Sequence, residues 1–115
     1  YATPDGTAKR DYVHVADVAA AHVAAFDALG DPARHAQLPA FTALNIGSGV
    51  GTSVRQAIAA VERATGTKLA VEPGPRRAGD PPRLVADVAR AAAVIGWRPR
   101  QSDIGRIVRS LVPGA

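Results

Sequence analysis

The chain has no cysteine and no methionine among its 115 residues, and aromatic residues make up only 4% of it. Without cysteine it can form neither disulfides nor thiolate metal sites. No apolar run approaches the ~18 residues of a membrane-spanning helix, and no charged-then-apolar leader opens the sequence. We therefore expect a cytoplasmic protein without a membrane anchor. Because no methionine stands at position 1, we also expect a piece of a longer chain.

What the sequence does contain is aliphatic and basic. Hydrophobic residues make up 47% of the chain, and the formal net charge is +4, carried mostly by arginine. The length suits one domain, so we treat residues 1–115 as a single domain. Guanidinium groups match phosphate in a bidentate way, which favours a phosphate-bearing partner. The arginines are scattered and follow no pattern of a nucleic-acid-binding motif, so we do not expect nucleic acid as that partner.

Along the chain, the hydrophobic pattern alternates between the two-residue period of strands and the roughly 3.6-residue period of helices. Short strands are predicted at 11–15, 41–46 and 69–72. Four helices are predicted, with Asp17 and Ser53 as the N-caps of the first two. Ser53 and Gln56 are predicted to form a capping box, and Gly66 and Gly96 to end the second and third helices. Alternating strands and helices indicate an α/β fold. The predicted helices cover 17–29, 54–65, 88–95 and 103–112, and the core face of the first is predicted to carry Val18, His22, Ala25, Phe26 and Leu29.

Two arginine-containing stretches are the main candidates for a binding site. Arg10 opens the stretch Arg-Asp-Tyr-Val-His-Val, and Arg77-Ala78-Gly79-Asp80 lies in a loop rich in proline at 73–82. The residues alone favour a simpler interpretation of Arg10, as a solvated charge on a strand. The loop could hold an internal Arg–Asp salt bridge worth only ~0–1 kcal/mol. The alternative is a clamp that the prolines hold ready for an anion, with little conformational entropy left to lose.

Other patterns that could carry chemistry are weaker. Gly47, Gly49 and Gly51 follow a predicted strand and precede a helix, but their spacing differs from the dinucleotide fingerprint, so we predict no cofactor site there. The three histidines have no metal-ligand spacing, and we predict no metal site. No nucleophile motif is present, and we assign no catalytic residue to this chain. We interpret Trp97, which follows a predicted helix, as a structural plug.

In their order and separation, the two arginine stretches resemble the C-terminal third of the UDP-galactose 4-epimerases, a branch of the extended short-chain dehydrogenase/reductase superfamily. The stretches at 44–49 and 95–99 agree with this resemblance. It implies that Arg10 and Arg77 hold the diphosphate of a UDP-sugar and that Asp80 accepts hydrogen bonds from the ribose hydroxyls. It also places Leu84 at the sugar pocket, where many bacterial members carry tyrosine.

The resemblance further implies that NAD and the catalytic Tyr-x-x-x-Lys pair belong to an N-terminal Rossmann part that this chain lacks. We therefore expect the C-terminal substrate-binding part of an NAD-dependent UDP-glucose/UDP-galactose 4-epimerase. Its parent is expected to be a homodimer, and the chain alone is expected to be inactive. Two alternatives remain open. One is a related nucleotide-sugar dehydratase, decarboxylase or uronate epimerase, and the other is a stand-alone anion-binding module.

Overall fold

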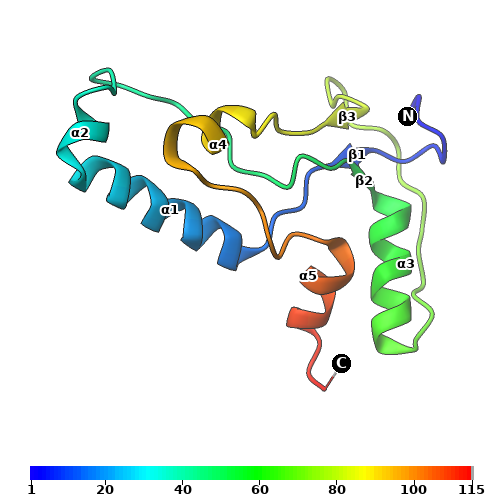
Figure 1. The fold of residues 1–115 in the computed structure, drawn as a ribbon. Helices are drawn as coiled ribbons and strands as arrows, with labels where there is room; N and C mark the ends of the chain where they lie inside the picture. The colour runs from blue at the N-terminus through cyan, green and yellow to red at the C-terminus, as the bar shows by residue number, and fades with distance from the viewer. Residues whose placement is uncertain (115) are drawn as a thin grey trace.

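The computed structural model describes residues 1–114, which form five helices and a small three-stranded sheet that lies to one side of α1 and α4 (Figure 1). The predicted α/β class is confirmed, and a short fifth helix, α2, joins the predicted four. The strands are β1 (Lys9–Arg10), β2 (Thr52–Ser53) and β3 (Arg83–Leu84). The helices are α1 (Val15–Gly30), α2 (Pro32–His35), α3 (Val54–Thr65), α4 (Ala89–Ile95) and α5 (Ile104–Leu111).

The sheet joins three segments that are far apart in the sequence. β1 is the central strand; it pairs with β2 in the antiparallel sense and with β3 in the parallel sense. In this register Arg10 lies opposite Thr52 on one side and Leu84 on the other. The sheet therefore places the first arginine stretch directly beside the segment that follows the proline-rich loop.

The predicted strands were wrong in position. Residues 11–14, 41–46 and 69–72 are irregular, and the real strands are two-residue pairings at other places. Phe41 is 82% exposed, and Leu69 and Val71 also face solvent. β-propensity reports how a side chain fits a partly buried, paired surface, and no paired strand reaches these segments. Leu44 and Ile46 nevertheless pack against the core, so part of the apolar signal at 41–46 was correct.

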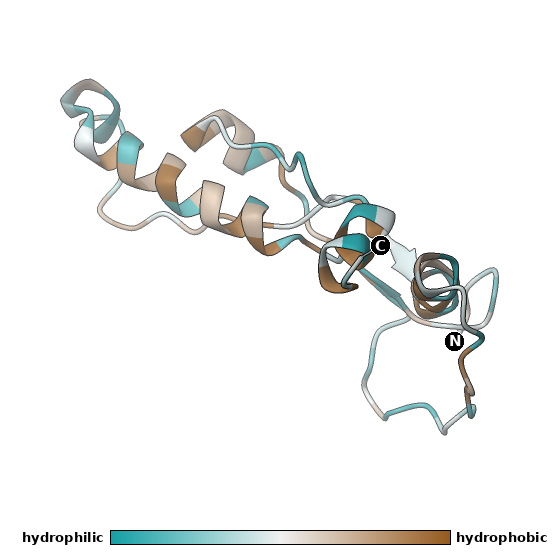
Figure 2. Ribbon diagram, turned by 90° about the horizontal axis from the view of Figure 1, so that it is seen from below, coloured by the Kyte–Doolittle hydropathy of each residue, from teal (hydrophilic) through white to brown (hydrophobic). Residues whose placement is uncertain are grey.

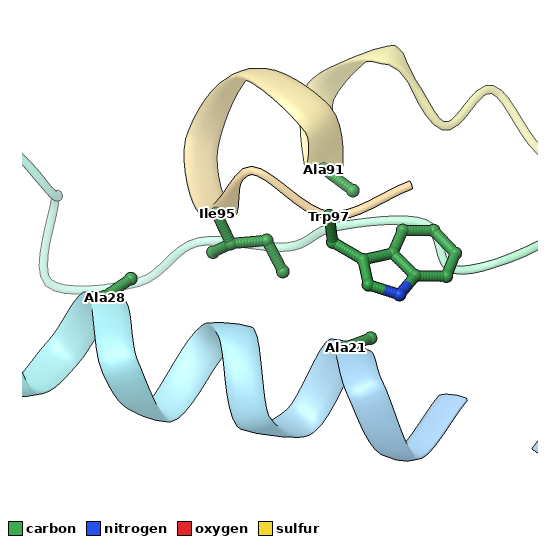
Figure 3. Packing of buried hydrophobic residues seen from close by; sticks show 5 residues of the cluster. All are labelled: Ala21, Ala28, Ala91, Ile95 and Trp97. Carbon is green, nitrogen blue, oxygen red and sulfur yellow. The ribbon is translucent and has the colours of Figure 1, made fainter. Parts of the chain in front are cut away.

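The main core lies between α1 and the α4 segment. Figure 3 shows Ala21 and Ala28 of α1 facing Ala91, Ile95 and Trp97. Trp97 is only 4% exposed, and its indole Nε1 donates a 2.9 Å hydrogen bond to the backbone carbonyl of Asp17. Because alanine has a small side chain, the helix can approach the indole ring closely. The interpretation of Trp97 as a structural plug is thus confirmed.

α1 buries a face that is shifted from the predicted one, although Ala25 of the predicted face does pack against the core. Its buried positions include Ala21 and Ala28, whereas Phe26 is 76% exposed and Leu29 is 54% exposed. His22, interpreted as a core residue, is also exposed, and its Nδ1 lies 2.8 Å from the carbonyl oxygen of Val18. An alanine stripe has the same helical period as the larger side chains, so the period alone could not choose between the two faces. Figure 2 shows hydrophobic turns along this helix.

Asp17 does not cap α1 as predicted. The N-cap is His14, whose Nδ1 accepts a hydrogen bond from the Ala16 amide. Asp17 is 2% exposed, and its carboxylate accepts hydrogen bonds from the amides of Arg100 and Gln101 and from the Ser102 hydroxyl. It therefore ties α1 to the segment that leads into α5.

At the ends of the other helices, the sequence signals predicted the structure correctly. Ser53 and Gln56 form the predicted capping box at the start of α3. Gly66 and Gly96 adopt the left-handed conformation that ends α3 and α4. Asp103 caps α5, accepting a hydrogen bond from the Arg106 amide. These features depend on neighbours in the sequence, which a sequence reading can see.

The described part of the chain is a thin slab rather than a sphere. Its principal extents are 53 × 38 × 18 Å and its radius of gyration is 17.4 Å, whereas a compact domain of this length has about 13 Å. Figure 2 shows the elements spread along one direction. Within residues 1–114, no helix has both the length and the apolar character needed to cross a membrane. The thinness explains why apolar side chains such as Phe26 remain exposed.

Candidate functional site

Arg10 is fixed at the centre of the sheet by three acceptors. One guanidinium nitrogen, Nη1, donates to the backbone carbonyls of Lys9 and Pro81 at 2.7 and 3.1 Å. The other, Nη2, donates to Oδ1 of Asp80 at 2.6 Å and forms an ion pair with it. The two arginine stretches found in the sequence are therefore parts of one cluster. The arginine keeps a quarter of its side-chain surface exposed, so its charge remains accessible to a ligand.

Asp80 is the point where this cluster converges. Besides Arg10, its carboxylate accepts a 2.5 Å hydrogen bond from the Tyr1 hydroxyl. Arg76 reaches the same place: its Nη2 donates to the Asp80 carbonyl at 2.8 Å, and its guanidinium lies 5.0 Å from the centre of the Tyr1 ring. The Tyr1 hydrogen bond, and after it the charges of Arg10 and Arg77, hold the pKa of Asp80 below its ordinary value. The carboxylate is therefore ionised at neutral pH.

Arg77 opens a tight turn that ends at Asp80. The Asp80 amide donates to the Arg77 carbonyl at 3.4 Å, and Gly79 has a φ of +77°. A positive φ at the third position is the feature of type II turns that calls for glycine. Within residues 1–114, the Arg77 side chain makes no hydrogen bond or ion pair, although it is close enough to Asp80 to lower that residue's pKa. Its guanidinium is available to an incoming anion.

An open cavity of about 470 Å³ lies against Arg10, and Leu84 forms part of its wall. This volume is within the usual range of ligand sites, roughly 300–1,000 Å³. Leu84 is 62% exposed and is paired in register with Arg10 across β1 and β3. The structure therefore brings Arg10, Asp80 and Leu84 together where β1 lies beside β3, with Arg77 on the adjoining turn. The cavity is lined by Arg10, Asp11, Leu44, Asn45, Ile46, Leu84, Val85 and Ala86.

Asp11 lines this cavity and joins the segments around it through hydrogen bonds. Its carboxylate accepts hydrogen bonds from the amides of Ser48, Gly49 and Ala86 and from the Ser48 hydroxyl, at 2.6 to 3.1 Å. Burial by itself would raise the pKa of Asp11, but these hydrogen bonds outweigh it and lower that pKa. One side chain thus joins the end of β1 to the 48–49 loop and to the segment after β3.

The glycine-rich loop at 47–51 does not fit a dinucleotide. Two backbone amides that a phosphate would need, those of Ser48 and Gly49, already donate to Asp11. A Cβ on Gly47 would lie 2.6 Å from an Asp11 oxygen, so this glycine serves close packing rather than an open phosphate cradle. The amides of Ser48 and Gly49 are therefore engaged within the protein rather than free to bind a phosphate.

Several residues of the site were not predicted from the sequence. Tyr1 lies 79 positions from its partner Asp80, and no local pattern links the two. Asp11, which lines the cavity, is not among the site residues predicted from the sequence. Arg76 is not among them either, and the structure places its guanidinium over the Tyr1 ring. Across residues 1–114, no group of three or more His, Cys, Asp or Glu side chains is arranged to hold a metal ion.

Comparisons with known proteins agree with this architecture. The profile of the NAD dependent epimerase/dehydratase family matches residues 2–47. A UDP-glucose 4-epimerase of Streptococcus mutans serotype c is 43% identical over 112 residues, which is 96% of this chain and 31% of that protein. The chain therefore spans about a third of the length of the curated relatives it matches.

Solved structures of the same enzymes share the fold. The UDP-glucose 4-epimerase from Brucella ovis, in complex with NAD, is 45% identical with a TM-score of 0.83; the match covers 95% of this chain and 32% of that one. The enzyme from Bifidobacterium longum, in complex with NAD⁺ and UDP, is 37% identical with a TM-score of 0.81, covering 96% and 30%. The chain is thus similar over nearly its whole length to UDP-glucose 4-epimerases, and it forms an α/β unit about a third of their size.

Proposed function

We propose that this chain is the C-terminal, substrate-binding domain of a longer NAD-dependent UDP-glucose 4-epimerase. The observation that carries the proposal is the meeting of Arg10 with the 77–80 turn through Asp80, beside a cavity of ligand size. Similarity to UDP-glucose 4-epimerases over nearly the whole chain supports the same conclusion. It also favours this reading over a stand-alone anion-binding module, because the relatives are enzymes about three times as long.

Each site residue has a defined task in this proposal. Arg10 and Arg77 hold the diphosphate, because guanidinium groups form strong charge-assisted hydrogen bonds with phosphate oxygens. Asp80 accepts hydrogen bonds from the ribose, since an ionised carboxylate offers two oxygens to two neighbouring hydroxyls. Leu84 forms an apolar wall of the sugar pocket. None of these side chains touches the reacting carbon, so their contribution is to orient the sugar from a distance.

NAD accepts a hydride from the sugar and returns it, and in this proposal it binds to the part of the protein outside residues 1–115. The support is that the amides of Ser48 and Gly49 in the glycine loop already donate to Asp11, so they are not free to hold a dinucleotide phosphate. The described residues of this chain thus contribute orientation rather than chemistry. The longer protein is proposed to be a cytoplasmic homodimer, which cell fractionation and light scattering of the purified protein would test.

Interconversion of UDP-glucose and UDP-galactose by the full-length protein tests the proposal. We expect the purified protein, supplied with NAD, to bring either sugar to the same equilibrium mixture. UDP-glucuronic acid, offered in parallel, should remain unchanged in the same assay. Conversion of the uronate alone would instead assign the protein to the sibling enzymes, and binding of UDP without conversion of either sugar would favour a binding module.

A further inference from the structure

Tyr1 belongs to the Asp80 cluster but has no role in the function proposed above. Its hydroxyl donates a 2.5 Å hydrogen bond to Oδ2 of Asp80, while Arg10 donates to the other oxygen, Oδ1, at 2.6 Å. Asp80 is partly buried, with 29% of its side chain exposed. Both carboxylate oxygens are thus engaged by the protein, and each has a different partner.

This arrangement leaves a defined capacity for further hydrogen bonds. An ionised carboxylate has about four acceptor positions, two on each oxygen. Arg10 uses one position on Oδ1, and Tyr1 uses one on Oδ2. One position then remains on each oxygen, which is the number and spacing that two neighbouring hydroxyls of a ribose require. Two fixed partners also stop the carboxylate from turning about its Cβ–Cγ bond.

Tyr1 is itself held in place by the arginine next in the cluster. The Arg76 guanidinium lies 5.0 Å from the centre of the Tyr1 ring, a cation–π distance, and Arg76 also donates to the Asp80 backbone carbonyl. The hydrogen bond from the Tyr1 hydroxyl to Asp80 raises the pKa of Tyr1, so the phenol keeps the proton that it donates. The phenol is therefore a fixed donor rather than a freely rotating surface side chain.

We propose that Tyr1 is a positioning residue that sets the preference of this site for ribonucleotides over deoxyribonucleotides. By fixing the orientation of the Asp80 carboxylate, the Tyr1 hydroxyl keeps one acceptor aimed at each ribose hydroxyl. Without this hydroxyl the carboxylate is held through Oδ1 alone. The difference in binding free energy between a ribonucleotide and a deoxyribonucleotide then becomes smaller. The inference rests on the proposed function, in which Asp80 recognises the ribose.

Calorimetry on the full-length protein tests this inference, with UDP and 2′-deoxy-UDP as the two probes. The variant is Tyr1→Phe, which removes only the hydroxyl. The measured ratio is the dissociation constant of 2′-deoxy-UDP divided by that of UDP. In Tyr1→Phe this ratio is expected to fall by about three- to tenfold, the effect of one hydrogen bond. Most of the change should come from weaker binding of UDP. Tyr12→Phe is the matched control, because the Tyr12 hydroxyl makes no hydrogen bond within the described residues, and its ratio should equal that of the wild type.

Asp80→Asn separates this inference from the function on which it rests. If Asp80→Asn lowers the ratio and Tyr1→Phe does not, Asp80 recognises the ribose without help and the inference is wrong. If Tyr1→Phe weakens UDP and 2′-deoxy-UDP equally, Tyr1 has only a structural role, which also overturns it. If the wild type does not distinguish the two nucleotides, or if Asp80→Asn leaves the ratio unchanged, the ribose assignment itself fails. A lowered ratio in both variants supports the inference.

Discussion

Arg10 and Asp80 are seventy positions apart in the chain, yet their side chains form an ion pair with 2.6 Å between Nη2 and Oδ1. The sheet produces this meeting, because β3 follows the proline-rich loop and lies parallel to β1. A second contact, from Arg10 to the Pro81 carbonyl, holds the loop at the same place. Two stretches that look independent in the sequence are therefore one cluster in the structure.

A first prediction compares Asp11 with Asp17. Both carboxylates accept several hydrogen bonds that join distant segments, so replacing either by asparagine removes at least one acceptor at a cost of ~1–3 kcal/mol. Asp11→Asn and Asp17→Asn should both lower the melting temperature of the full-length protein. Only Asp11 lines the cavity beside Arg10. We expect Asp11→Asn to raise KM for UDP-glucose and Asp17→Asn to leave it unchanged. A KM that rises equally in both variants would mean that Asp11 acts only through stability.

A second prediction concerns the titration of Asp5. Hydrogen bonds from the Ser53 hydroxyl, and then from the amide and hydroxyl of Thr7, lower the pKa of Asp5 from 3.8 to about 2. A lowered carboxyl pKa stabilises the fold above the unfolded-state pKa, and that stability is lost as the pH falls through the folded-state pKa. NMR titration of the full-length protein should find the Asp5 carboxyl still ionised at pH 3. Ser53→Ala should move the midpoint up towards 3.8, and a wild-type midpoint near 3.8 would contradict this assignment.

A third prediction concerns sugar selectivity. Leu84 is 62% exposed and forms part of the cavity wall beside Arg10. Leucine is smaller than tyrosine and has no hydroxyl that needs a partner, so the wall should leave room for an N-acetyl group. We expect the full-length protein to accept UDP-N-acetylhexosamines as well as UDP-glucose. Leu84→Tyr should restrict the accepted substrates to UDP-sugars without the acetyl group, because a filled pocket expands only at a high cost in free energy.

The selectivity of Leu84→Tyr is measured as the ratio of kcat/KM for acetylated and plain sugars. Val50→Tyr is a suitable control, since Val50 is exposed and does not line the cavity beside Arg10. Equal ratios in the wild type and in Leu84→Tyr would show that Leu84 does not border the sugar.

A fourth prediction concerns residues 1–115 expressed alone. The slab leaves Val15, Phe26 and other apolar side chains exposed, and its glycine loop is occupied by Asp11. We expect no epimerase activity and no tight NAD binding from this segment, and we expect it to self-associate in solution through the exposed apolar surface. Equilibrium dialysis with NAD and an epimerase assay are the measurements. Activity that stays with the purified segment through stringent washing would contradict the prediction.

The sequence predicts those features whose cause lies within a few residues. The capping box of Ser53 and Gln56 and the glycine ends of α3 and α4 depend on local chemistry, and they were predicted correctly. The strands were not, because a two-residue strand exists only through its partners in the sheet, and Lys9–Arg10 has no strand signal of its own.

The candidate site divides in the same way. Arg10, Arg77, Asp80 and Leu84 were predicted through a resemblance that local motifs carry. Tyr1 could not be, since only the fold places its hydroxyl on Asp80. Asp17 is a second example. It stands at the start of a helical pattern, as an N-cap would, but in the structure it is buried against the segment before α5 and accepts hydrogen bonds from three distant donors.

The central claim is that the arginines of this segment hold the diphosphate of a UDP-sugar, and the UDP affinity of Arg77→Ala in the full-length protein tests it most directly. Loss of a charge-assisted pair costs ~1.5–3 kcal/mol, so calorimetry should show UDP binding about ten- to over a hundredfold weaker. Arg63→Ala is the control, because Arg63 lies on α3 away from the cavity beside Arg10, and its affinity should match the wild type. An Arg77→Ala variant that binds UDP as tightly as the wild type would contradict the claim.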